Sequence, residues 1–227
     1  MFFTVDMGFF TLIGDSAMGF FSRKSKNKKQ PPKLICKPND IDSFKCILLA
    51  THRNLDLDIS WSEASALDNN LSNSLNLKET DSLPIIEDQD ITMSRADALL
   101  GYLNIKGGAP AVHPRKARVL AQQNYWIQLL DDKLKPLLSD FEGNKEAINT
   151  ILAAVDKQLS MGSFIVGEFT LADIHWLAAY RAIEERLSDS LTSLTHLSAW
   201  LIHMQDKIPH HACLLYTSPS PRDGLLS

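Results

Sequence analysis

The stretch Phe164-Ile-Val-Gly-Glu-Phe-Thr-Leu-Ala-Asp-Ile174 contains the start of a helix. Thr170 suits the N-cap position, and Asp173 follows three residues later, which is the spacing of a capping box. Phe169 and Ile174 occupy the two positions of a hydrophobic staple around that cap. We therefore predict a helix that begins directly after Thr170, with Thr170 and Asp173 in a structural role rather than in contact with a ligand.

A second stretch, Leu83-Pro-Ile-Ile-Glu-Asp-Gln-Asp-Ile-Thr-Met-Ser-Arg-Ala-Asp-Ala-Leu-Leu-Gly-Tyr-Leu103, predicts two short strands followed by a helix. The apolar runs Ile85-Ile86 and Ile91 to Met93 flank a polar turn, which is typical of a hairpin. The helix is expected from Ser94 to Leu103.

Earlier in the chain the pattern is strand, helix, strand. Leu34 to Cys36 is a short apolar run, Ser43 to Arg53 has apolar residues at helical spacing, and Leu55 to Trp61 alternates apolar with polar side chains. Together with the second stretch, the order strand-helix-strand-strand-strand-helix indicates a thioredoxin-like domain over residues 33–104.

After a linker with two glycines and two prolines, from Asn104 to Pro114, only helices are expected. Two helices are expected at about residues 171–187 and 196–207, and two more are indicated by apolar stripes at spacings of three and four. The stripes comprise Leu120, Ile127, Leu130, Leu134 and Leu137, and then Ile148, Ile151, Leu152, Val155 and Leu159. The fold class is thus α/β plus all-α, with a helical domain over residues 112–212.

The two ends of the chain depart from this pattern. Residues 1–32 form a leader in which a cluster of one arginine and four lysines lies between positions 23 and 29, and no acid occurs from Ser16 to Asn39. A disordered, solvated segment is therefore expected. A contact with phosphates or a membrane surface is the alternative. Residues 213–227 read as a non-native tail and are excluded from the fold. The true N-terminus and C-terminus stay open.

Composition argues against several kinds of function. The net charge of −4 does not suit a protein that coats nucleic acid, and no apolar run is long enough to span a membrane. The three cysteines, among them Cys36 and Cys46, have neither zinc nor disulfide-framework spacing, so buried thiols and a reducing, cytoplasmic location are expected. No metal site is indicated, because His203 has no partner at ligand spacing.

Residues 83–103 and 164–174 resemble two signatures of the glutathione S-transferase superfamily, and the resemblance covers residues 33–211. It implies a thioredoxin-like half followed by a helical half, with Pro84 in the cis form. In that family the backbone beside this proline, here Pro84 and Ile85, contacts the tripeptide glutathione. An acid-serine pair at the start of the next helix holds the γ-glutamyl group, and Arg95 and Ala96 stand at those two positions here.

These two departures bear on activity. Ala96 has no hydroxyl group, and Arg95 would repel the ligand's ammonium group, although it could meet the γ-glutamyl carboxylate. No tyrosine or serine motif of the family follows the first strand, where Ser43 and Asn39 are the stand-ins for the residue that activates sulfur. Ser43 is expected instead as a helix N-cap. No catalytic residue is therefore assigned, and glutathione is a cofactor only under the transferase alternative.

Two further segments resemble branches of the superfamily that lack glutathione chemistry. Lys37-Pro38-Asn39 with Phe44-Lys45 is similar to the opening of elongation factor 1 gamma. Residues 197–205 are similar to the transferase-like domains of aminoacyl-tRNA synthetases and their associated proteins. The resemblance implies a non-catalytic interaction module linked to translation, with other transferase-like or translation proteins as partners and a homodimer as a further option. The alternative is a divergent glutathione transferase acting on an unknown electrophile.

Overall fold

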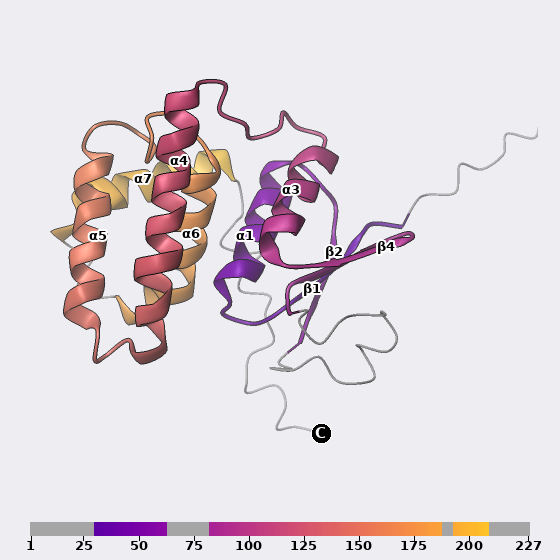
Figure 1. Ribbon diagram of the computed structural model, residues 1–227, viewed down its shortest axis with the longest axis horizontal. Coiled ribbons are helices and arrows are strands. Elements are labelled where there is room, and N and C mark those ends of the chain that lie inside the picture. The colour runs from indigo at the N-terminus through magenta and orange to yellow at the C-terminus, as the bar shows by residue number, and fades with distance from the viewer. Residues whose placement is uncertain (1–29, 63–81, 188–192, 209–227) are drawn as a thin grey trace, which may run out of the picture. The chain divides into compact units, whose positions relative to one another are not determined.

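The computed structural model describes residues 30–62, 82–187 and 193–208 (Figure 1). The predictions for the leader up to residue 29 and for the tail from residue 213 lie outside these residues. The described residues from Pro31 onward belong to one compact unit. None of its described helices is long and apolar enough to cross a membrane.

The first half of this unit is a mixed sheet with two described helices, α1 (Ile41–His52) and α3 (Ala96–Lys106). The strands are β1 (Lys33–Cys36), β2 (Asp58–Trp61), β3 (Ile85–Asp88) and β4 (Ile91–Ser94), in the spatial order β2-β1-β3-β4. β2 pairs with β1 in parallel, whereas the β1–β3 and β3–β4 pairs are antiparallel. This is the thioredoxin-like arrangement that the element order predicts.

Helix α1 begins two residues before the predicted start. Its N-cap is Asp40, whose carboxylate accepts a hydrogen bond from the Ser43 amide at 2.8 Å. The prediction that Ser43 caps this helix is therefore wrong. The charged carboxylate of Asp40 interacts more favourably with the positive end of the helix than a hydroxyl group does, and Ser43 falls at the third helical position.

The segment that joins the two halves starts later than predicted, because α3 continues through Asn104 to Lys106. Asn104 is buried, and its side-chain amide makes two hydrogen bonds, of 2.8 and 3.1 Å, to the backbone of Val112. Arg53 donates to the carbonyls of Asn104 and Gly107. A Cβ atom at Gly107 would lie 2.3 Å from the Cβ of Arg53, so this close approach requires glycine.

The second half is helical. Its elements are α4 (Ala117–Leu129), a π-helical turn η1 (Leu130–Leu134), a 3-10 segment η2 (Lys135–Asp140), α5 (Lys145–Leu159), α6 (Leu171–Ile183), η3 (Glu184–Arg186) and α7 (Thr195–Lys207). Leu130 and Leu134 of the first predicted stripe are buried in the core. Leu120 is an exception at 44% exposed, since the first turns of α4 are largely open to solvent.

One hydrophobic core joins the two halves. Helix α6 lies at its centre, with residues 172–179 all buried, and packs against α1 of the first half and α4 of the second (Figure 1). Because α1 and η1 both contact this region, the start of α1 comes to lie beside η1.

Candidate functional site

Four residues selected from the sequence, Pro84, Ile85, Arg95 and Ala96, lie at one end of the β3–β4 hairpin. The Leu83–Pro84 peptide bond is cis, and Pro84 is buried directly before β3. Ile85 is buried in the sheet opposite Ser94, so the chain before β3 and the chain after β4 leave the hairpin at the same end. Arg95 and Ala96 follow at that end.

Arg95 precedes α3 in a backbone conformation that residues other than glycine rarely adopt, with φ 72° and ψ 115°. Such conformations cost about 1–3 kcal/mol and are concentrated at ligand-binding positions. The exposed Arg95 side chain makes no capping hydrogen bond to α3. Ala96 opens the helix without a hydroxyl group that could hold a ligand carboxylate.

Arg95 and Ala96 line a polar hollow of about 220 Å³. The other lining residues are Ser82 and Asp97, Asp42 and Lys45 of α1, and Asp131 and Lys135 from the η1–η2 region. The charged side chains among them are three cations and three carboxylates. A small ligand that carries both an ammonium and a carboxylate group suits such a lining, because each of its charges can face an opposite one.

Four of these charges form a cluster that the sequence analysis missed. Lys45, whose side chain is only 2% exposed, lies 3.0 Å from Asp42 and 3.3 Å from Asp131. Lys135 lies 3.0 Å from Asp42 and 3.5 Å from Asp131. Burial alone would raise the pKa of the Asp42 carboxyl, but the two ammonium groups outweigh it and hold this pKa below its usual value.

His175 of α6 is buried, and the charges of this cluster affect its pKa. Burial, and then the positive charge of Lys45, lower the pKa of His175 to about 3, against an opposing contribution from Asp42. Its Nδ1 atom has no hydrogen-bond partner among the described residues. The imidazole is therefore neutral near pH 7 and packs as an uncharged ring.

We expect the stability of the variant His175→Leu to be less sensitive to acid than that of the wild type. The pKa of His175 falls from 6.5 to about 3 on folding, so its contribution to stability is present above pH 6.5 and is lost as the pH falls towards 3. From pH 6.5 downward, the free energy of unfolding of the wild type should decrease relative to the variant by about 1.4 kcal/mol per pH unit. Urea unfolding measures the difference, with His196→Leu at an exposed position as the control. A difference that stays constant with pH would contradict a buried neutral imidazole.

Ser43 and Asn39 are not among the described residues that line the hollow. The buried Ser43 hydroxyl donates to the Asp40 carboxylate at 2.8 Å and accepts from the Lys37 amide at 3.0 Å. It therefore orders the turn between β1 and α1. Asn39 lies in the same turn with φ 53°, a left-handed conformation that asparagine tolerates.

Both described cysteines are buried free thiols, as the sequence analysis expected. Burial raises the pKa of Cys36 to about 12 and the pKa of Cys46 well above its usual value. Neither thiol is ionised near pH 7, and a buried neutral thiol is a poor nucleophile. In the part of the chain that the structure describes, no three His, Cys, Asp or Glu side chains gather as a metal site would require.

Thr170 and Asp173 form a capping box at the start of α6, where the sequence places them. The fully buried Asp173 carboxylate accepts hydrogen bonds from the amides of Thr170 and Ile165 at 2.9 and 3.0 Å, and from the Trp200 indole at 3.0 Å. Burial raises its pKa to about 6, although these donors act in the opposite direction. Asp173 thus joins α6, α7 and the preceding loop, away from the hollow.

A mixed sheet with a cis-proline directly before one of its inner strands, packed on a helical bundle, defines the glutathione S-transferase fold class. Residues 125–206 match the family model described as glutathione S-transferase, C-terminal domain. No curated protein matches the sequence.

Solved structures share this fold. A delta-class glutathione transferase of Nilaparvata lugens matches with a TM-score of 0.67 and 19% identity over 79% of this chain and 90% of its own. Glutathione transferase F2 of Populus trichocarpa matches with a TM-score of 0.66 and 14% identity over 83% of this chain and 100% of its own. Ure2p in complex with glutathione matches with a TM-score of 0.65 and 14% identity over 82% of this chain and 93% of its own. The chain thus has the glutathione S-transferase fold, and its residues 125–206 match the model of that family's C-terminal domain.

Proposed function

We propose that this chain is a non-catalytic glutathione S-transferase-like interaction module associated with the translation machinery. The observation that carries the proposal is the pair Arg95-Ala96 in the lining of the polar hollow. Without a carboxylate and a hydroxyl at these positions, the γ-glutamyl group of glutathione loses an ion pair and a hydrogen bond.

The state of the candidate sulfur-activating groups supports the same proposal. The Ser43 hydroxyl is buried and engaged in the β1–α1 turn, and the thiols of Cys36 and Cys46 are buried and protonated. The hollow does contain the hydroxyl of the exposed Ser82, which the sequence analysis did not consider. No histidine is among the described residues that line the hollow, so none of them lies beside Ser82 as a general base.

The link to translation rests on sequence resemblance. Residues 37–45 are similar to the opening of elongation factor 1 gamma, and residues 197–205 to transferase-like domains of the synthetase complex. The interaction partners proposed are therefore other transferase-like or translation proteins in the cytoplasm, with a homodimer as a further assembly. Ala199 stands exposed on α7 where that group often has an interface arginine, so the surface used by this chain differs in detail.

A divergent glutathione transferase is the second candidate. It is favoured by the mixed charge of the hollow and by the position of Arg95, whose guanidinium group can meet the γ-glutamyl carboxylate. The similar structure of Ure2p holds glutathione on the same fold.

We expect the wild-type chain to bind glutathione with a dissociation constant weaker than about 1 mM, equivalent to less than about 4 kcal/mol. It should not conjugate glutathione to an aryl halide. Calorimetry measures the first quantity and absorbance of the conjugate measures the second. Micromolar affinity together with conjugation would replace the interaction proposal by the transferase, and Ser82 would then be the first residue to mutate.

A further inference from the structure

Two adjoining hollows lie at the start of α4. The larger, of about 530 Å³, lies between the segment 109–113, Phe169 and the end of α7. The smaller, of about 400 Å³, lies between the first turns of α4, the loop 164–167 and the end of α5. Lys116 lines both, so the two hollows form one continuous surface. We call this surface the α4-start groove; its lining includes Arg115, Lys116, Arg118, Met161, Phe169 and Lys207.

The α4-start groove is positively charged although the chain as a whole carries −4. Its lining includes the cations Arg115, Lys116, Arg118 and Lys207 and a single carboxylate, that of Glu168. None of these four cations takes part in the ion pairs found among the described residues. The N-terminus of helix α4 adds partial positive charge to the groove, because its first turn has no acidic residue and no side-chain cap.

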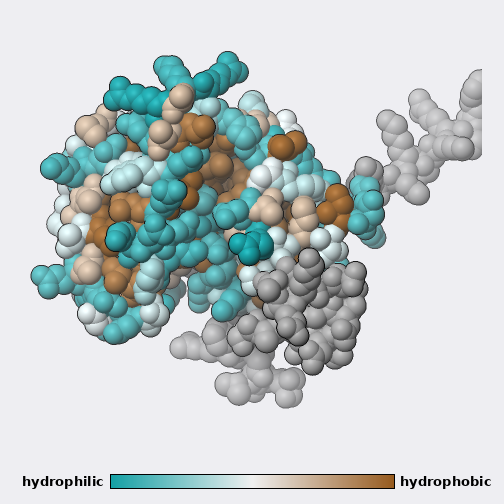
Figure 2. Space-filling model, in the orientation of Figure 1, coloured by the Kyte–Doolittle hydropathy of each residue, from teal (hydrophilic) through white to brown (hydrophobic). Residues whose placement is uncertain are grey.

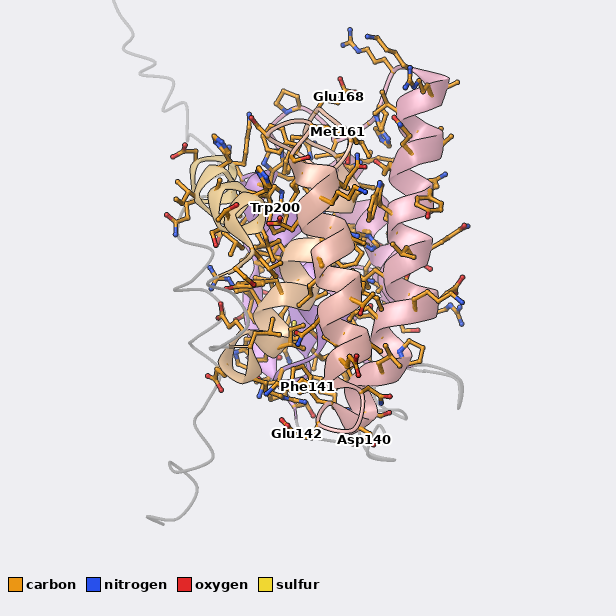
Figure 3. The ribbon with its side chains drawn as sticks, turned by 90° about the vertical axis from the view of Figure 1, so that its left-hand side faces the viewer. Asp140, Phe141, Glu142, Met161, Glu168 and Trp200 are labelled. Carbon is orange, nitrogen blue, oxygen red and sulfur yellow. The ribbon has the colours of Figure 1, made fainter. Side chains whose placement is uncertain are left out.

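The floor of the groove is apolar and aromatic. The rings of Phe164 and Phe169 meet edge to face at 5.8 Å, and His52 stacks obliquely on Phe169 at 4.6 Å. Met161, 75% exposed, stands at the rim. Figure 3 places Met161 and Glu168 at one end of the helices and Asp140 to Glu142 at the other. Figure 2 shows hydrophilic side chains over the start of α4 with hydrophobic surface directly below them.

We propose that the α4-start groove binds an acidic segment of a partner protein that also carries an aromatic or large aliphatic side chain. The cations pair with its carboxylates, and the apolar side chain enters the larger hollow beside Phe169. We choose an acidic segment as the occupant because its carboxylates complement the four cations of the groove. Residues 209–227 contain one aspartate and one arginine, so this segment does not supply the acidic charge.

A nucleic acid fits the groove less well. Strong binding to a phosphate backbone uses about 6–10 phosphate contacts, more than four cations provide. The carboxylate of Glu168 lies among those cations and would face a continuous row of phosphates, whereas a peptide can place an uncharged residue there. The net charge of −4 adds a long-range repulsion for a polyanion.

The groove is separate from the hollow beside Arg95. The two are joined by α4 and η1, and the positions from Lys116 to Asp131 span about 20 Å of helix. This proposal rests on the proposed interaction function and adds the chemical character of the partner segment. Its test does not involve glutathione, so its failure is distinguishable from a failure of the proposed function.

The experiment selects partners without assuming their sequence. Short random peptides displayed on phage are panned against the whole chain, and enriched peptides are synthesised and titrated by calorimetry. The charge-reversed variant combines Lys116→Glu with Arg118→Glu. Its matched control combines Lys133→Glu with Lys145→Glu, which makes the same change of charge in η1 and at the start of α5. A third variant, Met161→Ser, removes an exposed apolar side chain from the rim.

The enriched peptides should be acidic and contain an aromatic or large aliphatic residue. Their affinity should fall at least about tenfold in the charge-reversed variant, fall less for Met161→Ser, and stay unchanged in the matched control. The proposal is overturned if no peptide is enriched, if the enriched peptides are not acidic, or if both double variants bind equally. Displacement of the peptide by a single-stranded RNA at lower concentration would also overturn it, in favour of a nucleic-acid surface.

Discussion

Replacing Arg95 by glutamate and Ala96 by serine should raise the affinity for glutathione by at least about tenfold. The serine hydroxyl restores a hydrogen bond worth about 0.5–1.5 kcal/mol, and more with a charged partner. The glutamate turns a repulsion of the ligand's ammonium group into an attraction. It also changes the lining of the hollow from three cations and three carboxylates to two cations and four carboxylates. Calorimetric titration with glutathione measures the gain.

A matched control separates this local effect from the change in net charge. Ala154→Ser with Lys157→Glu makes the same kinds of substitution at exposed positions of α5 and should leave glutathione binding as in the wild type. Turnover with an aryl halide should not appear in either variant, because neither adds a group that activates sulfur. Equal glutathione affinity in the Arg95→Glu/Ala96→Ser variant and in the control would show that residues 95 and 96 do not contact the tripeptide.

The variant Asp173→Ala should lose about 3 kcal/mol or more of unfolding free energy, because each buried donor left without a partner costs about 1–3 kcal/mol. The sequence alone indicated only a capping box, whose loss costs about 0.5–2 kcal/mol. The structure adds the Ile165 amide and the Trp200 indole to the donors that Asp173 satisfies. Urea unfolding above pH 7, where the carboxyl is ionised, gives the free energy.

The variant Asp156→Ala allows a comparison, because it removes a carboxylate that accepts fewer hydrogen bonds than Asp173 does. The half-buried Asp156 accepts one hydrogen bond from α7, from the Leu197 amide at 2.8 Å, so its replacement should cost about 1 kcal/mol. The two variants remove the same chemical group. Equal losses in both would mean that the additional donors around Asp173 contribute nothing to stability.

Asp173 also illustrates how far the sequence could predict the fold. Its pairing with Thr170 is local and follows from a spacing of three residues, so the start of α6 was predictable. Its bond to Trp200 joins residues 27 apart in the chain, and only the packing of α7 on the bundle brings them together. The order of strands and helices along the chain and the helical character of the second half were predictable in the same way, from periodicity and short motifs.

The candidate hollow was predictable only in part, for the same reason. Arg95 and Ala96 were found because a signature fixes their distance from Pro84. The pairs Asp42–Lys45 and Asp131–Lys135 each have helical spacing and look like ordinary surface ion pairs in the sequence. Their union depends on the contact between α1 and η1, which no local pattern encodes. Ser43 was misassigned because a serine and an aspartate three residues apart can both cap a helix.

The buried ammonium of Lys45 has a consequence for how the molecule could be divided. One of its counter-charges, Asp42, belongs to its own helix, whereas Asp131 comes from the helical half, and a single core passes between the halves. A fragment that ended in the segment after α3 would expose this ammonium and the apolar face of α1 together. We therefore expect the two halves to unfold as one cooperative unit. A chimaera joined at the boundary between the halves would have to keep Lys45 together with Asp131.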